Sequence, residues 1–346
     1  MSARESRTGS TRNRPRGGTA TGSMTRGTAG VDVPVLDRAV VGTVPSLARA
    51  AGVLLVLAGV VGAVAPFPTY LVVGGHPIAL AGGVGSALVS LLVPAANLAT
   101  GVVLARGLVP KLGLAYAGVS GALAVGALLI ELYRGSASTA RPALEVIAGR
   151  QVLTSTVEVR AGWVLGVAAL VLAVLAGAAA LPAWGRTVMD DGGTLDPVRS
   201  ALAGAAVLLG VGTVLCLALP AADLPRRVVT DPSTGMQTVV TQEGPQALLE
   251  RPGLALLGGL LLAGGIVLCS VVAPSLRPRL ATVGGLLAIA VTVLAAALDG
   301  LRDALGSSGL EWTVPGAGLL LAGLGYGALT VLAWRVRRVA VGGQHS

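Results

Sequence analysis

The stretch that decides the fold class is 162–182, which reads GWVLGVAALVLAVLAGAAALP. It contains no charged residue. A helix needs about 20 mainly apolar residues to cross the hydrocarbon core of a bilayer. This stretch therefore predicts a helix that spans a membrane.

Seven further stretches have the same character, and each is bounded by proline, glycine or charge, as helix ends usually are. The full set is 47–66, 86–106, 112–132, 162–182, 200–220, 254–273, 280–298 and 314–334. The sequence thus predicts an all-α integral membrane protein with eight transmembrane helices.

The composition of the 346-residue chain agrees with this fold class. Hydrophobic residues make up 53%, charged residues only 12%, and the mean hydropathy is +0.81. A soluble domain is about 25% charged, so an ordinary soluble enzyme is excluded. The two cysteines, Cys216 and Cys269, lie inside apolar runs and are expected to be inert rather than a disulfide or metal pair.

The few charges predict an orientation. The net charge is +9, and basic residues collect on the cytoplasmic side of membrane proteins. With the N-terminus inside, basic residues fall in every short inner connection, and most acids fall outside: Glu131, Glu145, Glu158, Asp223, Asp231, Glu243, Glu250, Asp299, Asp303 and Glu311. We expect a multi-pass plasma-membrane protein with both termini in the cytoplasm, and the basic excess then requires no nucleic-acid partner.

The ends of the chain are polar. Residues 1–44 are rich in Ser, Thr, Gly and Arg, and such a segment cannot bury enough apolar surface to become ordered. We expect a disordered basic cytoplasmic tail, either merely solvated or in contact with anionic lipid headgroups. Residues 339–346 are expected to form a short cytoplasmic C-terminal tail.

The four tryptophans fit the same arrangement. Trp163 and Trp184 bracket one predicted span, and Trp312 and Trp334 bracket another. Each pair is separated by roughly 32 Å of helix at about 1.5 Å per residue. Because tryptophan prefers the two membrane interfaces, all four are expected to be interfacial anchors.

An internal duplication is indicated by residues that punctuate the spans. Residues 107–112 match 275–280 at an offset of 168, which also places Glu131 on Asp299 and Arg134 on Arg302. Pro66 matches Pro220, and Glu158 matches Glu311, at offsets of 154 and 153. We expect two tandem four-helix repeats, 45–186 and 187–338.

The predicted outer loops carry strand signals. Residues 226–241 contain two β-branched runs around Asp-Pro-Ser-Thr-Gly, which is typical of a β-hairpin, and 70–80 resembles a smaller one. The two hairpins either pair into one sheet or lie separately over their own repeats. Residues 142–152 form either a short amphipathic helix or a solvated loop.

The best candidate polar site lies at the predicted outer helix ends. Glu131 and Asp299 each precede an arginine by three residues, Arg134 and Arg302. This spacing allows ion pairs on one helix face. They are either interfacial structural pairs or part of an ion or substrate path, since charges near membrane depth often mark such paths. Glu158 and Glu311 are weaker candidates.

Asn97, in mid-span, is expected to form an interhelical hydrogen bond, with a substrate contact as the alternative. His76 is expected to be a solvated turn residue. Close helix packing is indicated by two small-residue faces, Gly118, Ala122 and Gly126, and Gly323 and Gly327.

Enzyme motifs are lacking in the sequence, so no catalytic residue, metal site or cofactor is predicted. We expect a non-enzymatic scaffold or accessory subunit that acts at the outer membrane face in a cell-envelope complex. The alternatives are a transporter with a path between the repeats and a membrane-embedded enzyme acting on lipid. The expected partners are the lipid bilayer and a membrane protein bound through the outer loops. The sequence does not predict an oligomeric state.

Overall fold

The computed structural model describes residues 40–136, 144–147, 150–153, 157–190, 195–223, 227–230, 237–240, 247, 252–306 and 310–336. The chain divides into two compact units, Met1–Leu36 and Asp37–Ser346, and every described residue belongs to the second. Most of the tail predicted for 1–44, and the tail predicted for 339–346, lie outside the described residues.

In the part of the chain that the structure describes, eight α-helices occupy the predicted stretches, and each is long and apolar enough to cross a membrane. They are α1 (Ser46–Val64), α2 (Val84–Ala105), α3 (Pro110–Arg134), α4 (Ala161–Trp184), α5 (Asp196–Leu217), α6 (Leu254–Val272), α7 (Arg279–Gly306) and α8 (Val314–Arg335). The prediction of eight long apolar helices is confirmed.

Two helix boundaries differ from the prediction by several residues. Helix α5 begins four residues early because Pro197 occupies its first turn, where a missing amide hydrogen costs nothing. Helix α7 extends past 298 to Gly306. Its last turns are polar, and Arg302 compensates their two acids, Asp299 and Asp303.

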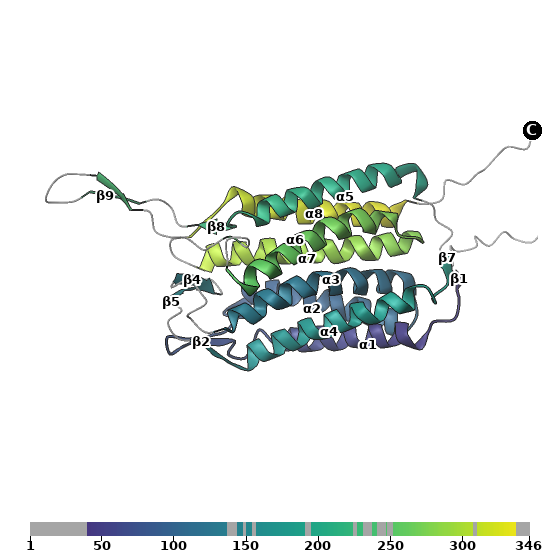
Figure 1. Cartoon of the computed structure of the whole chain (residues 1–346), viewed down its shortest axis with the longest axis horizontal. Coiled ribbons are helices and arrows are strands. Elements are labelled where there is room, and N and C mark those ends of the chain that lie inside the picture. The colour runs from purple at the N-terminus through teal and green to yellow at the C-terminus, as the bar shows by residue number, and fades with distance from the viewer. Residues whose placement is uncertain are drawn as a thin grey trace, which may run out of the picture. The chain divides into compact units, whose positions relative to one another are not determined.

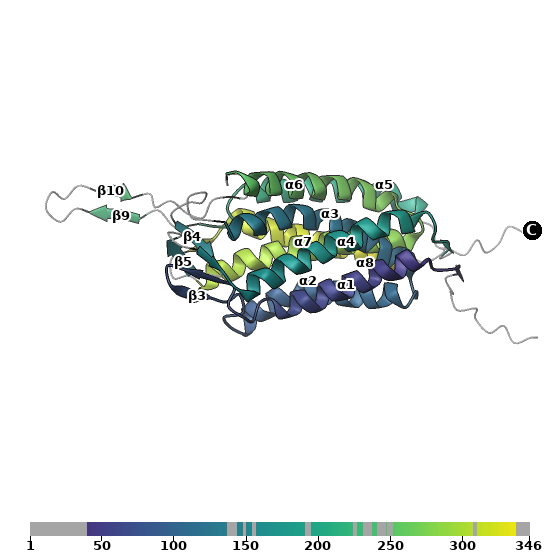
Figure 2. The same ribbon diagram turned by 60° about the horizontal axis from the view of Figure 1, so that its bottom comes forward.

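The helices pack in a regular pattern. Helix α1 lies against α2 and α4, and α3 against α4; likewise α5 lies against α6 and α8, and α7 against α8. The groups α1–α4 and α5–α8 meet where α3 packs on α6 and α7, and where α2 packs on α7 (Figures 1 and 2). Helices α3 and α7 are the most buried of the eight.

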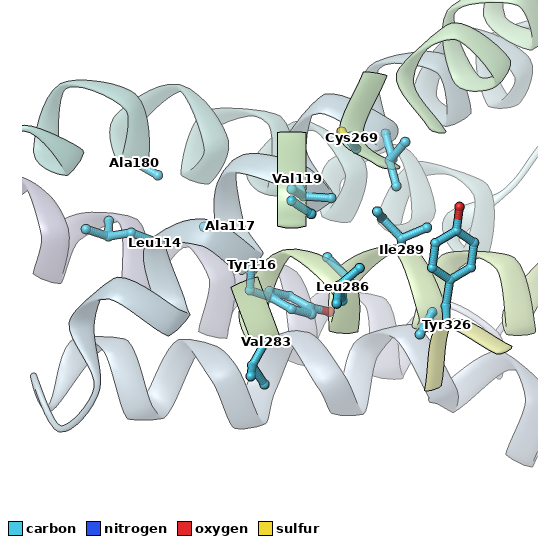
Figure 3. Close-up of a cluster of buried hydrophobic side chains, with 14 of the residues drawn as sticks. Leu114, Tyr116, Ala117, Val119, Ala180, Cys269, Val283, Leu286, Ile289 and Tyr326 are labelled. Atoms are coloured by element: carbon cyan, nitrogen blue, oxygen red, sulfur yellow. The ribbon is translucent and has the colours of Figure 1, made fainter. Parts of the chain in front are cut away.

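The centre of the bundle is an apolar cluster built mainly on α3 and α7. Tyr116 from α3 and Leu286 and Ile289 from α7 are buried there, with Tyr326 of α8 beside them (Figure 3). The hydroxyl of Tyr326 donates to the carbonyl oxygen of Ala206 at 3.0 Å. Its polar atom is therefore satisfied inside the apolar core.

Some helix crossings require glycine. A Cβ atom on Gly126 of α3 would lie 2.6 Å from the carbonyl oxygen of Gly258 in α6, so these backbones touch. The predicted small-residue faces are partly correct. Gly126 and Gly323 do lie at tight contacts, whereas a Cβ on Gly118 or Gly327 would meet nothing within 4 Å.

Short strands cap one end of the helices. Strands β2 (Leu71–Val73), β3 (His76–Ile78) and β6 (Val157–Val159) form an antiparallel sheet in the order β3-β2-β6. Gly74 and Gly75, with φ values of 57° and 81°, make the turn between β2 and β3. Strand β8 (Ala222–Asp223) pairs with β11 (Glu311–Trp312).

Three further strand pairs lie within the described ranges. Strand β9 (Arg227–Thr230) pairs with β10 (Gln237–Val240), β4 (Leu144–Ile147) with β5 (Arg150–Leu153), and β1 (Val40–Val41) with β7 (Met189–Asp190). Among the described residues, the β9–β10 and β2–β3 pairs belong to separate sheets, so the structure does not show the alternative of one shared sheet. The helix considered for 142–152 is also wrong for the described residues, because Leu144–Ile147 and Arg150–Leu153 are paired antiparallel strands.

The two ends of the helix bundle differ in charge. The hairpin end carries β2 to β6 and β8 to β11, and the basic end carries β1, β7 and the starts of α3 and α7 (Figure 1). Among the described residues, the basic end has eight basic and two acidic residues, and the hairpin end has five basic and seven acidic ones.

Candidate functional site

Glu131 forms the centre of a polar site at the hairpin end. It lies in the last turn of α3, and its side chain is only 12% exposed. Its carboxylate accepts a hydrogen bond from the Tyr70 hydroxyl and pairs with Nη1 of Arg134 at 3.5 Å. Its main-chain oxygen accepts a hydrogen bond from Nε1 of Trp163 at 3.0 Å. Glu131 thus joins three segments of the chain.

The small sheet places Tyr70 over the end of α3. The main-chain N–H of Tyr70 donates to Ile78, and its carbonyl oxygen accepts from Arg160. These bonds extend the β2–β3 and β2–β6 ladders by one residue. Trp163 follows directly in the first turn of α4. Local strand pairing therefore determines where both partners of Glu131 lie.

The second half of the site lies in α7. Arg302 bridges two carboxylates: Nη1 is 3.1 Å from Oδ1 of Asp299, and Nη2 is 3.0 Å from Oδ1 of Asp303. The Arg302 side chain is 15% exposed, whereas that of Asp299 is 50% exposed. The guanidinium is therefore enclosed, and one acid remains accessible.

The two halves meet because α3 packs directly on α7. The ion pairs themselves lie within one helix each, Glu131 with Arg134 in α3, and Arg302 with both acids in α7. We call Glu131, Arg134, Asp299, Arg302 and Asp303 the charged cluster. All four residues predicted for the polar site belong to it.

Sequence reasoning missed two members of this environment. Asp303 lies four residues after Asp299 on the same helix, and this spacing places the two acids on one helix face, so the sequence could have indicated it. Tyr70 is 61 residues away from Glu131, and nothing in its local sequence indicates the contact. Asp299 and Arg302 also lie within α7 rather than at its end.

The remaining candidates lie elsewhere. Glu158 and Glu311 are exposed on β6 and β11, and Glu158 pairs with Arg160 at 2.6 Å. Asn97 is buried in α2, where its Oδ1 accepts a hydrogen bond from the Tyr116 hydroxyl at 2.9 Å. This bond to α3 accounts for Asn97 through helix packing.

The tryptophans have individual roles. Trp163 contacts Glu131, and Trp184 lies beside Lys111, whose Nζ is 4.0 Å from its ring centre. Trp334 is 55% exposed, and its carbonyl oxygen accepts a hydrogen bond from Arg279. Trp312 lies in β11 opposite Ala222. His76 is exposed in β3.

The charged cluster combines three carboxylates with two guanidinium groups, so most of its charge is compensated internally. Among the residues that the structure describes, no group of three His, Cys, Asp or Glu side chains is placed to hold a metal ion. The ion pairs stabilise the ends of α3 and α7 individually and leave one carboxylate accessible on Asp299.

The fold and site define a multi-pass helical protein whose eight apolar helices are compatible with a membrane. Comparisons with protein-family models, with curated proteins and with solved structures found no match.

Proposed function

We propose that this chain is a plasma-membrane scaffold or accessory subunit, without enzymatic activity, that binds a partner at its hairpin end within a cell-envelope complex. The observation that carries the proposal is the internal pairing of polar groups among the helices. Asn97 pairs with Tyr116, Tyr326 lies 2.6 Å from Ser270, and Arg302 bridges two acids. Polar groups that bind each other favour a structural role over a path for solutes.

The proposal includes two tandem repeats, 45–186 and 187–338. Two hydrogen bonds at equivalent positions in the repeats support them. Nζ of Lys111 donates to the carbonyl oxygen of Trp184 at 2.7 Å, and Nη1 of Arg279 donates to that of Trp334 at 3.0 Å. In both cases a cation at the start of the third helix caps the end of the fourth.

The strand pairing supports the same repeats. In each, a strand after the first helix pairs with the strand that precedes the fourth helix: β2 with β6, and β8 with β11. The helix neighbours also correspond, since α3 packs on α6 as α7 packs on α2. Two copies with an even number of spans would share one orientation and be related by an axis roughly normal to the membrane.

The charge difference between the two ends supports an orientation with the basic end in the cytoplasm. Cysteine accessibility tests this in a chain whose native cysteines are replaced by Cys216→Ala and Cys269→Ala. We expect Gly235→Cys, and not Arg106→Cys, to react with an impermeant maleimide added to intact cells. The opposite labelling pattern would reverse the orientation.

Partner binding is tested by extraction of the tagged full chain in mild detergent, after crosslinking in cells. We expect a defined protein to copurify in constant ratio. Replacing 227–240, the β9–β10 pair, by a short Gly-Ser link should release it without lowering the unfolding temperature. Replacing 144–153, the β4–β5 pair, is the matched control for shortening a hairpin. A monomer that carries no other protein contradicts the proposal.

A transporter is the second candidate, and the convergence of four predicted charged residues between α3 and α7 favours it. Such a path requires the acids themselves. In a strain that lacks the gene, the wild-type chain should restore transport, and Glu131→Gln and Asp299→Asn should each fail to restore it. Arg160→Gln, at an exposed pair, is the control. If both acid variants restore full activity while keeping normal unfolding temperatures, the charged cluster is not a transport path.

A further inference from the structure

Six arginines surround the basic end in two sets of three. The first set borders the start of α1, and the second set borders the start of α5. The sets are Arg49, Arg106 and Arg186, and Arg199, Arg277 and Arg335. Five of these side chains are exposed, and Arg199 is half-buried.

Helix packing brings the first set together. Arg49 lies in the first turn of α1, Arg106 follows the last residue of α2, and Arg186 follows the end of α4 by two residues. Since α1 packs on both α2 and α4, the ends of α2 and α4 each lie beside the start of α1. The main-chain N–H groups of Arg106 and Arg186 bond to the preceding helical turns, which fixes both positions.

The second set repeats this placement. Arg199 lies in the first turn of α5, Arg335 is the last residue of α8, and Arg277 follows the short 3-10 helix Ala273–Ser275. Helix α5 packs on α6, on α8 and on that 3-10 helix. Arg49 and Arg199 are the fourth residues of α1 and α5, respectively.

Each set lies next to apolar surface. Leu181 of α4 is 73% exposed one turn before Arg186, and Leu332 of α8 is 47% exposed just before Arg335. In the sequence, Trp184 lies between Leu181 and Arg186, and Trp334 lies between Leu332 and Arg335. Tryptophan prefers the membrane interface. A ligand at either set would meet guanidinium groups at one end and an apolar helix face at the other.

We propose that each set of three arginines binds the headgroup of one anionic phospholipid, with the acyl chains along the adjoining helix face. Guanidinium groups bind phosphate oxygens in a bidentate manner, and anionic headgroups attract clustered arginines. The exposed leucines beside the arginines favour a lipid over free phosphate. This inference rests on the membrane placement in the proposed function but not on the scaffold role.

The test is native mass spectrometry of the full chain, released from micelles that contain equal amounts of phosphatidylglycerol and phosphatidylcholine. We expect two phosphatidylglycerol molecules to be retained. The variant R49Q/R106Q/R186Q should lose one, and R199Q/R277Q/R335Q should lose the other. Titration with phosphatidylglycerol should show that the apparent affinity for this lipid falls about fivefold for each arginine removed.

Two controls separate binding from folding. R49K/R106K/R186K keeps the charge and should retain most of the bound lipid, while Arg160→Gln, at the hairpin end, should retain both molecules. Equal retention of phosphatidylcholine, or full retention by both glutamine variants, overturns the proposal. Absence of a copurifying protein would contradict the scaffold role and leave the lipid result unchanged.

Discussion

Lys111 donates a hydrogen bond from Nζ to the main-chain carbonyl oxygen of Trp184, 2.7 Å away, and its ammonium group lies over the Trp184 ring. The side chain of Lys111 is buried. Because the last carbonyls of a helix have no partner within it, this lysine satisfies the end of α4 while fixing the start of α3 beside it. A positive charge there also complements the helix dipole.

Removing this contact should weaken the fold. We expect Lys111→Met to lower the free energy of unfolding by about 2 kcal/mol, because a charge-assisted hydrogen bond and a cation–π contact are both lost. Equilibrium unfolding in detergent, followed by tryptophan fluorescence, measures the change. Lys111→Arg should recover most of the loss, since Arg279 makes the corresponding bond to Trp334. Equal destabilisation by the arginine and methionine variants would contradict this account.

The contact of α3 with α6 predicts a strong effect from a single methyl group. In Gly126→Ala the new Cβ would meet the carbonyl oxygen of Gly258 and the nitrogen of Leu262, each at 2.6 Å. Backbone atoms cannot rotate away, so the helices must separate, at a cost of about 1–3 kcal/mol for overpacking. Thermal unfolding should show a clearly lower midpoint for Gly126→Ala. Gly118→Ala, on open surface of the same helix, should be neutral or stabilising by up to about 1 kcal/mol.

The eight helices were predictable because each depends on local composition. A run such as 162–182 has a single favourable environment, and proline, glycine and charge indicate its ends. Helix α7 continued past the predicted end because Asp299 and Asp303 are compensated by Arg302. That compensation depends on side-chain geometry that hydropathy does not record.

The charged cluster was predictable only in part. The three-residue spacing of Glu131 with Arg134, and of Asp299 with Arg302, identified each ion pair. Their approach to each other follows from the packing of α3 on α7, and the contact with Tyr70 follows from the strand pairing that holds β2 beside β6. Both are long-range relationships. The tight contact at Gly126 and the open surface at Gly118 likewise differ only in their neighbours.

The hydrogen bond between Asn97 and Tyr116 should be a coupled pair. Tyr116→Phe leaves the Asn97 Oδ1 without its donor inside the bundle, and we expect a loss of about 1 kcal/mol, as is typical of hydrogen bonds between membrane helices. The double variant Asn97→Leu with Tyr116→Phe should cost less than the sum of the two single variants. A double-mutant cycle on unfolding free energies measures the coupling, and strict additivity would show that the bond contributes nothing.

Arg302 should be the most sensitive member of the charged cluster, because it compensates two acids while enclosed by the protein. We expect Arg302→Gln to lower the free energy of unfolding by about 2 kcal/mol, since its enclosed guanidinium makes charge-assisted hydrogen bonds to two acids. Adding Asp299→Asn should restore part of that stability by removing one of the two orphaned carboxylates. Arg160→Gln serves as the control, because its pair with Glu158 is exposed and should contribute less than about 1 kcal/mol. Chemical unfolding of all four proteins at one pH and ionic strength makes the comparison. If Arg302→Gln is no more damaging than Arg160→Gln, the ion pairs of Arg302 do not stabilise the fold.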